Sequence, residues 1–149
     1  MEIQVAEHGT VGQIMTKRVT SLSPQNSVLE AVNLFTECGF RHIPVVDAAG
    51  KLAGVLSDRD VLRAMIRNPH SDRTSIASIM VKEPVTAKPD MPLIDVIDVV
   101  IFHRIGCLPI LDGTGKLCGI VTTTDLLGAF HDLLHETQPA RQRKPSGAA

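Results

Sequence analysis

The fold is decided by RHIPVVDAAGKLAGVLSDRDVL, residues 41–62, because this stretch returns as GCLPILDGTGKLCGIVTTTDLL at residues 106–127. The two stretches lie 65 residues apart, and the match continues without a gap over residues 11–65 and 76–130. A match of this length indicates an internal duplication, which determines the architecture before any single motif is considered. We therefore expect the chain to be built from two copies of one supersecondary unit.

Each repeat predicts the same order of elements, β-α-β-β-α, over residues 11–67 and 76–135. Apolar residues at helical spacing indicate helices, and short apolar runs bounded by Gly or Pro indicate strands. The capping box of Ser27 and Glu30 marks the start of the first helix, and Gly39 marks its end. The expected strands are 19–22, 42–47 and 52–57, then 85–87, 108–112 and 117–122. The expected helices are 28–38 and 58–67, then 93–104 and 123–135.

The fold class expected from this plan is α/β (α+β), with tandem β-α-β-β-α repeats related by a pseudo-twofold axis. One repeat of this size has a thin core and would be marginal alone, so the two repeats should bury their sheets together. A cleft with two equivalent positions then lies between them. Residues 136–149 are polar and contain Pro and Gly, which predicts a disordered tail.

Composition excludes several classes of protein. The 149 residues hold 15 Lys and Arg against 16 Asp and Glu, and no Trp or Tyr, which argues against a nucleic-acid partner. No stretch is apolar and long enough to span a bilayer, and the N-terminus lacks the pattern of a signal peptide, so we expect no membrane partner. The cysteines Cys38, Cys107 and Cys118 form no paired framework, which predicts reduced thiols and a cytoplasmic protein.

One motif that could bind a ligand occurs in both repeats. GVLSDRD (residues 54–60) and GIVTTTD (residues 119–125) both fit G-x-x-[ST]-x-x-D at the junction of the third strand and the second helix. A helix N-terminus offers unpaired N–H groups to a phosphate, and a nearby hydroxyl adds a hydrogen bond. A carboxylate one turn later can accept hydrogen bonds from the two hydroxyls of a ribose.

A simpler interpretation of the motif stays open. S-x-x-D is nearly a capping box, which a helix after a strand requires with or without a ligand. The glycine three residues before each hydroxyl is not explained by capping, and we interpret Gly54 and Gly119 as positions where a ligand approaches the backbone.

Taken together, the duplicated plan, the paired hairpins and the two G-x-x-[ST]-x-x-D motifs resemble a pair of cystathionine-β-synthase (CBS) domains, also called a Bateman module. The resemblance covers residues 11–134, nearly the whole chain. It implies a regulatory module that binds adenosine-containing ligands (AMP, ADP, ATP, S-adenosylmethionine or a dinucleotide such as NAD) in the cleft. It also implies a dimer, no catalytic activity and no catalytic cofactor. No enzyme, channel or transporter domain accompanies the repeats, so we expect a free-standing module that signals to a separate, unknown protein.

The resemblance assigns site residues position by position. Asp60 and Asp125 resemble the ribose-binding carboxylates, and Ser57 and Thr122 resemble the hydroxyl donors. The expected ligand-binding residues of the first repeat are Thr20, Arg41, His42, Ile43, Pro44, Ser57, Arg59 and Asp60. Those of the second repeat are Thr86, Gly106, Cys107, Leu108, Pro109, Thr122, Thr124 and Asp125.

Other clusters carry less weight. Cys38 with His42 and His103 with Cys107 could in principle hold zinc or form a catalytic pair, but the spacing of a structural zinc site and a third orienting group are missing. His131 and His135, one turn apart, could clamp a metal ion, although a solvated helix end explains them equally well. We therefore expect no metal site. The basic tail of Arg141, Arg143 and Lys144 is interpreted as solvated.

Two further expectations concern assembly and charge. Val99, Ile101 and Phe102 lie outside the apolar stripe of the helix expected at 93–104, which predicts a homodimer packed through this helix and its counterpart around Leu34. An alternative function is then a ligand-free module for dimerisation and docking. Arg41, Arg59 and Arg63 belong to the first repeat only. They predict that the site of Asp60 prefers di- or triphosphates and the site of Asp125 prefers AMP.

Overall fold

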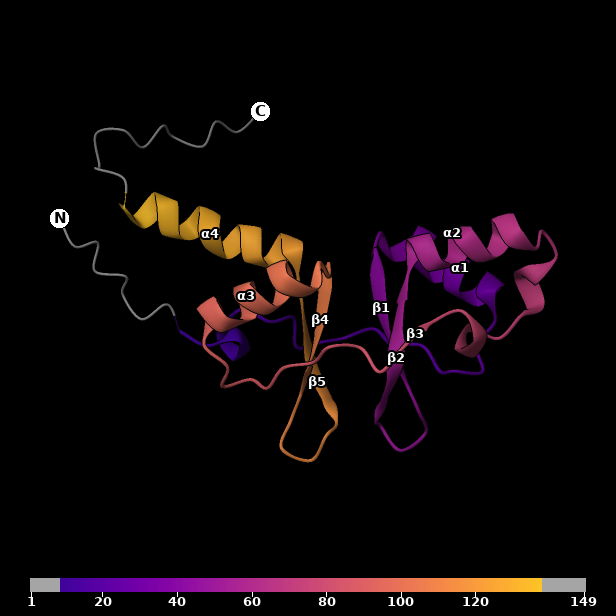
Figure 1. Ribbon diagram of the computed structural model, residues 1–149, viewed down its shortest axis with the longest axis horizontal. Coiled ribbons are helices and arrows are strands. Elements are labelled where there is room, and N and C mark those ends of the chain that lie inside the picture. The colour runs from indigo at the N-terminus through magenta and orange to yellow at the C-terminus, as the bar shows by residue number, and fades with distance from the viewer. Residues whose placement is uncertain (1–8, 138–149) are drawn as a thin grey trace.

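Two lobes stand side by side, each made of a hairpin with two helices (Figure 1). The structure, a computed structural model, describes residues 9–137. The first lobe contains α1 (Val28–Cys38), β1 (His42–Val46), β2 (Leu52–Ser57) and α2 (Asp58–Arg67). The second contains α3 (Leu93–His103), β4 (Cys107–Leu111), β5 (Leu117–Thr122) and α4 (Thr123–Thr137). Both hairpins point the same way, and the helices gather at the opposite end.

The helices and hairpins predicted from periodicity are confirmed, most of them to within a residue. The capping box at the start of α1 is formed: the backbone N–H of Glu30 donates to Ser27 Oγ (3.1 Å), and that of Ser27 donates to Glu30 Oε2 (2.6 Å). Gly39 adopts φ 68° and ends the helix. These elements follow from local signals, because caps and helical spacing act within a few residues.

Four details differ from the expectation. The runs at 19–22 and 85–87 form no strand; each contributes one parallel bridge, Leu22 to Val45 and Ala87 to Ile110. Cys38, expected in the buried stripe of α1, is exposed, whereas Val99 packs against the second core. Helix α4 continues to Thr137, two residues into the tail expected to be disordered. Residues 138–149, with the basic tail, lie outside the described residues, as do residues 1–8.

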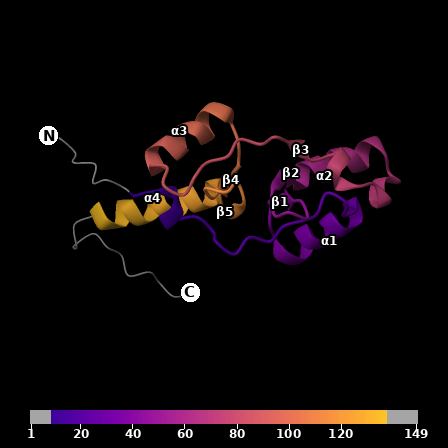
Figure 2. The same ribbon diagram turned by 90° about the horizontal axis from the view of Figure 1, so that it is seen from below.

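The first residues of the two repeats are exchanged between the lobes. A short strand, β3 (Val81–Lys82), lies near the start of the second repeat but pairs with β2 of the first lobe, Val55 opposite Val81. The equivalent residue near the start of the first repeat, Thr16, bridges to Ile120 of β5. Three 3-10 helices belong to the connecting segments: η1 (Val11–Gln13), η2 (Ser71–Arg73) and η3 (Ile76–Ser78). In Figure 2 two chain segments cross between the lobes, one from each exchange.

Packing follows the exchange. The core of the first lobe includes Ile76 of η3 beside Val28, Ile43 and Leu56. The core of the second lobe includes Val11 of η1 beside Val96. A third cluster, Val55, Cys107 and Ile120 with the partly buried Val19, joins the two lobes. Each lobe is therefore completed by the segment that leads into the other repeat. No helix in the described part of the chain has the length and hydropathy needed to cross a membrane.

Candidate ligand-binding site

A cleft of about 940 Å³ is the natural candidate for a binding site. It lies where α2 and α4 begin and is lined by both lobes. From the first repeat and its leading segment come Thr16, Arg18, Val19, Thr20, Gly39, Phe40, Arg41, His42, Pro44, Ser57, Asp58 and Arg59. From the second come Arg104, Gly106, Ile120, Thr122, Thr123, Thr124 and Asp125.

Both helices open on a capping box, as the simpler interpretation of the motif predicts. The backbone N–H of Asp60 donates to Ser57 Oγ (3.1 Å), and that of Ser57 donates to Asp60 Oδ2 (2.9 Å). In α4 the backbone N–H of Thr122 donates to Asp125 Oδ2 (2.8 Å), and the Thr122 hydroxyl donates to the same oxygen (3.1 Å). Within residues 9–137 no hydrogen bond reaches Oδ1 of either aspartate, so each carboxylate keeps one oxygen for a ligand.

Ten of the sixteen residues expected to bind the ligand line this cleft: Thr20, Arg41, His42, Pro44, Ser57, Arg59, Gly106, Thr122, Thr124 and Asp125. Six do not: Ile43, Asp60, Thr86, Cys107, Leu108 and Pro109. The two sets expected at separate sites thus share one cleft, in which the arginines of the first repeat stand with Asp125 of the second. Arg63, expected to contribute charge, lies outside it.

Five of the six residues outside the cleft have a physical reason to lie elsewhere. Ile43, Leu108 and Pro109 are fully buried in the cores, and Cys107 belongs to the cluster between the lobes. Thr86 is shifted by one position from Thr20 in the repeat alignment, so it alternates to the other side of its extended run. Burial raises the pKa of the Cys107 thiol to about 12, with a further contribution from Asp125, which keeps it uncharged and unreactive.

The interpretation of Gly54 and Gly119 as ligand contacts is wrong. A Cβ on Gly54 would lie 2.5 Å from the backbone oxygen of Val81, and one on Gly119 would lie about as close to the sulfur of Met15. Both methionines of the repeated IM pair, Met15 and Met80, pack at these glycines. The glycines therefore accommodate the exchanged segments rather than a ligand.

His42 connects the lobes at the cleft. A Cβ on Gly106 would lie 2.9 Å from Cε1 of His42, so the ring packs directly over this glycine of the other lobe. Burial lowers the pKa of His42, against the opposing effect of the carboxylates of Asp58 and Asp60. The imidazole is accordingly held neutral at the lobe contact.

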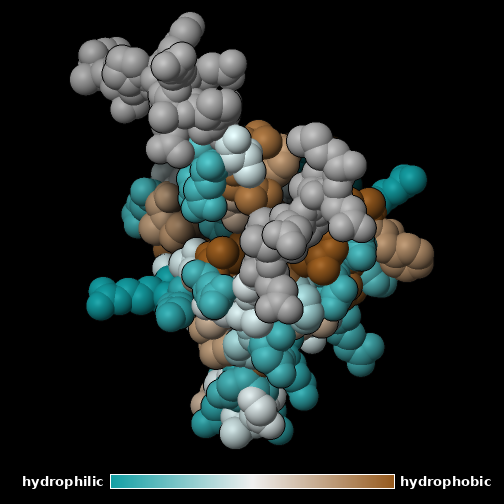
Figure 3. All heavy atoms as spheres, turned by 90° about the vertical axis from the view of Figure 1, so that its left-hand side faces the viewer, coloured by the Kyte–Doolittle hydropathy of each residue, from teal (hydrophilic) through white to brown (hydrophobic). Residues whose placement is uncertain are grey.

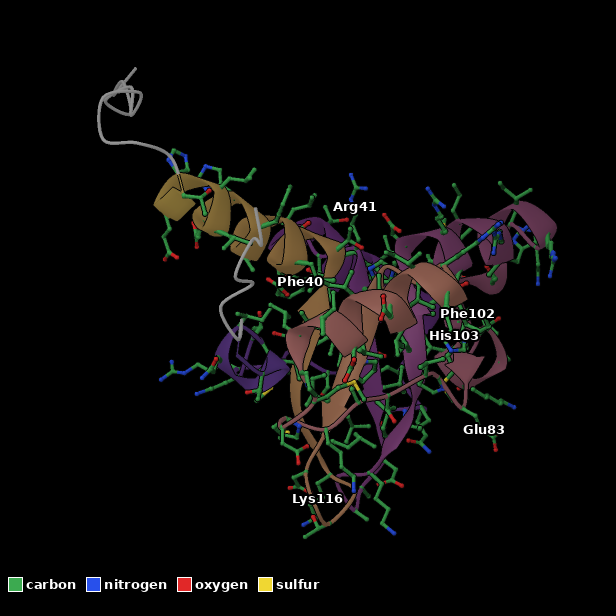
Figure 4. The ribbon with its side chains drawn as sticks, turned by 60° about the vertical axis from the view of Figure 1, so that its left-hand side comes forward. Phe40, Arg41, Glu83, Phe102, His103 and Lys116 are labelled. Carbon is green, nitrogen blue, oxygen red and sulfur yellow. The ribbon has the colours of Figure 1, made fainter. Side chains whose placement is uncertain are left out.

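Sequence reasoning missed several residues that line the cleft. Among them are the cationic side chains of Arg18 and Arg104 and the aromatic ring of Phe40. Arg104 ends α3 with φ 54°, the left-handed conformation that Gly39 adopts at the equivalent position of α1. The repeat alignment pairs Arg104 with Gly39, and that pairing was the available signal. Figure 4 places Arg41 at the helical end of the molecule, opposite Lys116 at the hairpin end.

The possible metal ligands do not form a cluster. Over residues 9–137 no group of three or more His, Cys, Asp or Glu side chains is arranged to hold a metal ion. Cys38 is exposed and Cys107 is buried, so they occupy different environments. His131 and His135 do approach each other, with 3.1 Å between their Nε2 atoms.

Comparisons with known proteins agree with this architecture. A family model described as CBS domain matches residues 11–67 and again 76–132. CBS domain-containing protein YhcV of Bacillus subtilis (strain 168) is 34% identical over 117 residues, 78% of this chain and 82% of that protein. Inosine-5'-monophosphate dehydrogenase of Nitrosopumilus maritimus (strain SCM1) is 33% identical over 77% of this chain, which spans only 23% of the dehydrogenase.

Two solved structures similar to this chain hold adenosine compounds. CBSX2 from Arabidopsis thaliana in complex with AMP superposes with a TM-score of 0.77 at 27% identity, covering 85% of this chain and 98% of that one. The CBS domain pair of protein MJ0100, in complex with 5'-methylthioadenosine and S-adenosyl-L-methionine, gives 0.76 at 27% identity, covering 83% and 97%. Their common ligand feature is the adenosine group.

Proposed function

This chain belongs to the CBS-domain family, and we propose that it is a regulatory module that binds an adenosine-containing nucleotide in the cleft between its lobes. The observation that carries the proposal is that one cleft of about 940 Å³ joins two helix N-termini, an aspartate with a free oxygen and an apolar wall. The AMP complex of CBSX2 and the adenosine complexes of MJ0100 support the ligand class.

The cleft residues suit the parts of such a ligand. Asp125 Oδ1 can accept from ribose hydroxyls, because Oδ2 alone serves the helix cap. The N-termini of α2 and α4 provide N–H groups and partial positive charge for phosphate. Val19, Phe40 and Ile120 provide apolar surface for the adenine ring.

We do not transfer the activity of the dehydrogenase relative, because the match covers 23% of that enzyme. The module would instead report nucleotide levels to a separate protein, as a homodimer in the cytoplasm.

A thermal-shift panel tests the proposal with adenosine, AMP, ADP, ATP, NAD and S-adenosylmethionine. A ligand at 100 times its Kd adds about 2.7 kcal/mol to the free energy of unfolding, which is readily measured as a rise in Tm. GMP and CMP are the matched controls for the base. No shift with any adenosine compound, at concentrations up to the millimolar range, would contradict the proposal.

A second function, ligand-free dimerisation and docking, is favoured by one observation. Large apolar side chains are exposed on all four α-helices, among them Leu29, Leu62, Met65, Ile101, Phe102, Leu127 and Phe130. Figure 3 shows apolar surface exposed between polar groups on the end formed by the second lobe. A dimer without any nucleotide response would favour this function.

A further inference from the structure

Four arginines line the cleft, and they come from four different segments. Arg18 precedes the first lobe, Arg41 leads into β1, Arg59 lies in the first turn of α2, and Arg104 ends α3. Among the described residues the single ion pair is that of His131 with Asp132, so all four guanidinium groups are without a carboxylate partner within 4.0 Å. Convergence of four such cations on one cavity calls for an anion that the protein itself does not supply.

The charge is local to the cleft. The whole chain carries a net charge of −1, whereas the cleft lining holds four arginines against the two aspartates Asp58 and Asp125. Asp60 does not line the cleft and caps α2 by accepting from the backbone N–H of Ser57. A concave surface with excess positive charge and low-dielectric walls concentrates anions.

The arginines are not required by the repeated fold. Their equivalents 65 residues away are Glu83, Gly106, Thr124 and Gly39, none of which is a cation. Gly39, Gly106 and Thr124 line the same cleft, while Glu83 lies far from Arg41 in the view of Figure 4. The two lobes share one fold although only one of each pair of equivalent positions holds an arginine. We infer that these arginines have a role other than packing.

Arg104 strengthens this point. Its backbone adopts φ 54°, a conformation in which a side chain is strained and glycine is not. The equivalent Gly39 adopts φ 68°. A strained residue whose side chain reaches a cavity is a candidate for function rather than for stability.

We propose that these four arginines select a nucleotide that carries a chain of three or more phosphates over a nucleoside monophosphate. The inference rests on the proposed function, because it assumes that the cleft binds a nucleotide. A guanidinium group engages phosphate oxygens with two parallel hydrogen bonds. One terminal phosphate places all its oxygens at a single point, so it cannot form two-pronged hydrogen bonds with four guanidinium groups that come from four different segments. A triphosphate chain offers three groups of oxygens and more negative charge, so it can contact more of these arginines at once.

Titration calorimetry with adenosine, AMP, ADP, ATP and inorganic triphosphate, at constant ionic strength with and without Mg²⁺, tests this inference. Affinity should increase with each added phosphate, and ATP should bind at least about tenfold more tightly than AMP. Arg18→Gln and Arg104→Gln should each weaken ATP binding more than AMP binding, so that the ratio of ATP to AMP affinity falls by about tenfold. Arg63→Gln, on α2 but outside the cleft, is the matched control and should change neither affinity.

The possible outcomes distinguish selection for a longer phosphate chain from nucleotide binding itself. If AMP binds as tightly as ATP or more tightly, the selection for phosphate is overturned while nucleotide binding stands. If the arginine variants leave the ratio of ATP to AMP affinity unchanged, the four arginines are not its cause and the inference fails. If inorganic triphosphate binds in an arginine-dependent manner but no adenosine compound does, phosphate recognition is supported and the proposed adenosine function fails. The four side chains are exposed, so their replacement is not expected to unfold the protein, and a melting curve of each variant checks this.

Discussion

Asp125 and Asp60 occupy equivalent positions, but only Asp125 lines the cleft. Asp125→Asn keeps an oxygen for the cap of α4 while removing the charge that would hold the ribose hydroxyls. We expect nucleotide affinity to fall by about 1.5–3 kcal/mol, with Tm nearly unchanged in the absence of ligand. Asp60→Asn is the matched control and should leave nucleotide affinity intact. Titration calorimetry on both variants checks this, and equal losses in the two would restore a second, equivalent site.

His42 makes stability depend on pH. Burial at the lobe contact lowers the pKa of this imidazole below its usual 6.5, so the unfolded chain binds the proton more readily than the folded one. Stability is therefore fully present above pH 6.5 and is lost as the pH falls from there toward the folded-state pKa. We expect the urea midpoint to decrease between pH 8 and pH 5, and His42→Gln to remove that part of the decrease.

Between pH 8 and pH 5 the carboxylates with lowered pKa values do not contribute to the expected decrease. The pKa values of Glu30 and Asp112 are lowered by hydrogen bonds, from 4.5 and 3.8, so both groups stay ionised above pH 5. Their stabilising effect is lost only in more acidic solution. An unchanged pH dependence in His42→Gln would contradict the role given to this residue.

Residue roles were predictable to different degrees. Ser57 and Thr122 were identified because a hydroxyl before a helix has a local role that its neighbours reveal. Ile43 and Leu108 are buried and do not line the cleft, which the sequence did not indicate, because a strand covered on both faces buries consecutive residues and shows no alternation. Arg18 was missed because its place in the cleft depends on the path of a connecting segment.

At the scale of elements, the helices were predictable and the exchange of segments was not. Helical spacing and caps locate α1 and α2 from the residues themselves. A repeat in sequence does not say which copy a leading segment packs on, because the alternatives have the same local pattern. The runs at 19–22 and 85–87 look like strands for the same reason, yet each meets a neighbouring strand at one residue only.

The exchanged segments explain the two glycines, and the explanation can be tested. At Gly54 an added Cβ meets the backbone oxygen of Val81, which cannot move alone, whereas at Gly119 it meets the flexible side chain of Met15. Gly54→Ala should therefore lower the free energy of unfolding by about 2–3 kcal/mol, and Gly119→Ala by about 1 kcal/mol. Urea denaturation gives both values.

Gly113 is the control for these substitutions, because nothing lies within 4 Å of a Cβ there and its backbone is unstrained. Gly113→Ala should change the free energy of unfolding by no more than about 0.5 kcal/mol. Equal, small effects at Gly54 and Gly119 would contradict the packing described for the exchanged segments.

At the scale of the whole molecule, the exposed apolar residues predict assembly. Phe102 is 81% exposed and Ile101 68%, on the helix that sequence analysis singled out. Leu34, around which the counterpart is expected, is partly buried and packs against the first core. The structure also shows exposed apolar residues at equivalent repeat positions of α2 and α4. Leu62 corresponds to Leu127, and Met65 corresponds to Phe130.

The helices that carry these residues lie toward the end of the molecule opposite the hairpin turns (Figure 1). A twofold dimer needs one patch that is complementary to itself, and apolar helices at a single end supply it. We therefore expect a homodimer at micromolar concentration, measured by light scattering. Phe102→Glu and Phe130→Glu should each weaken it by at least about tenfold, because a charge buried in an apolar interface is costly.

Val81→Glu provides the control, since Val81 is also exposed but lies on β3, away from the helices. This variant should dimerise like the unmodified protein. A strict monomer at all concentrations would rule the assembly out. A dimer that survives both phenylalanine substitutions and dissociates with Val81→Glu would place the interface on the exchanged strand instead, since a short strand with an unpaired edge can pair with a second copy.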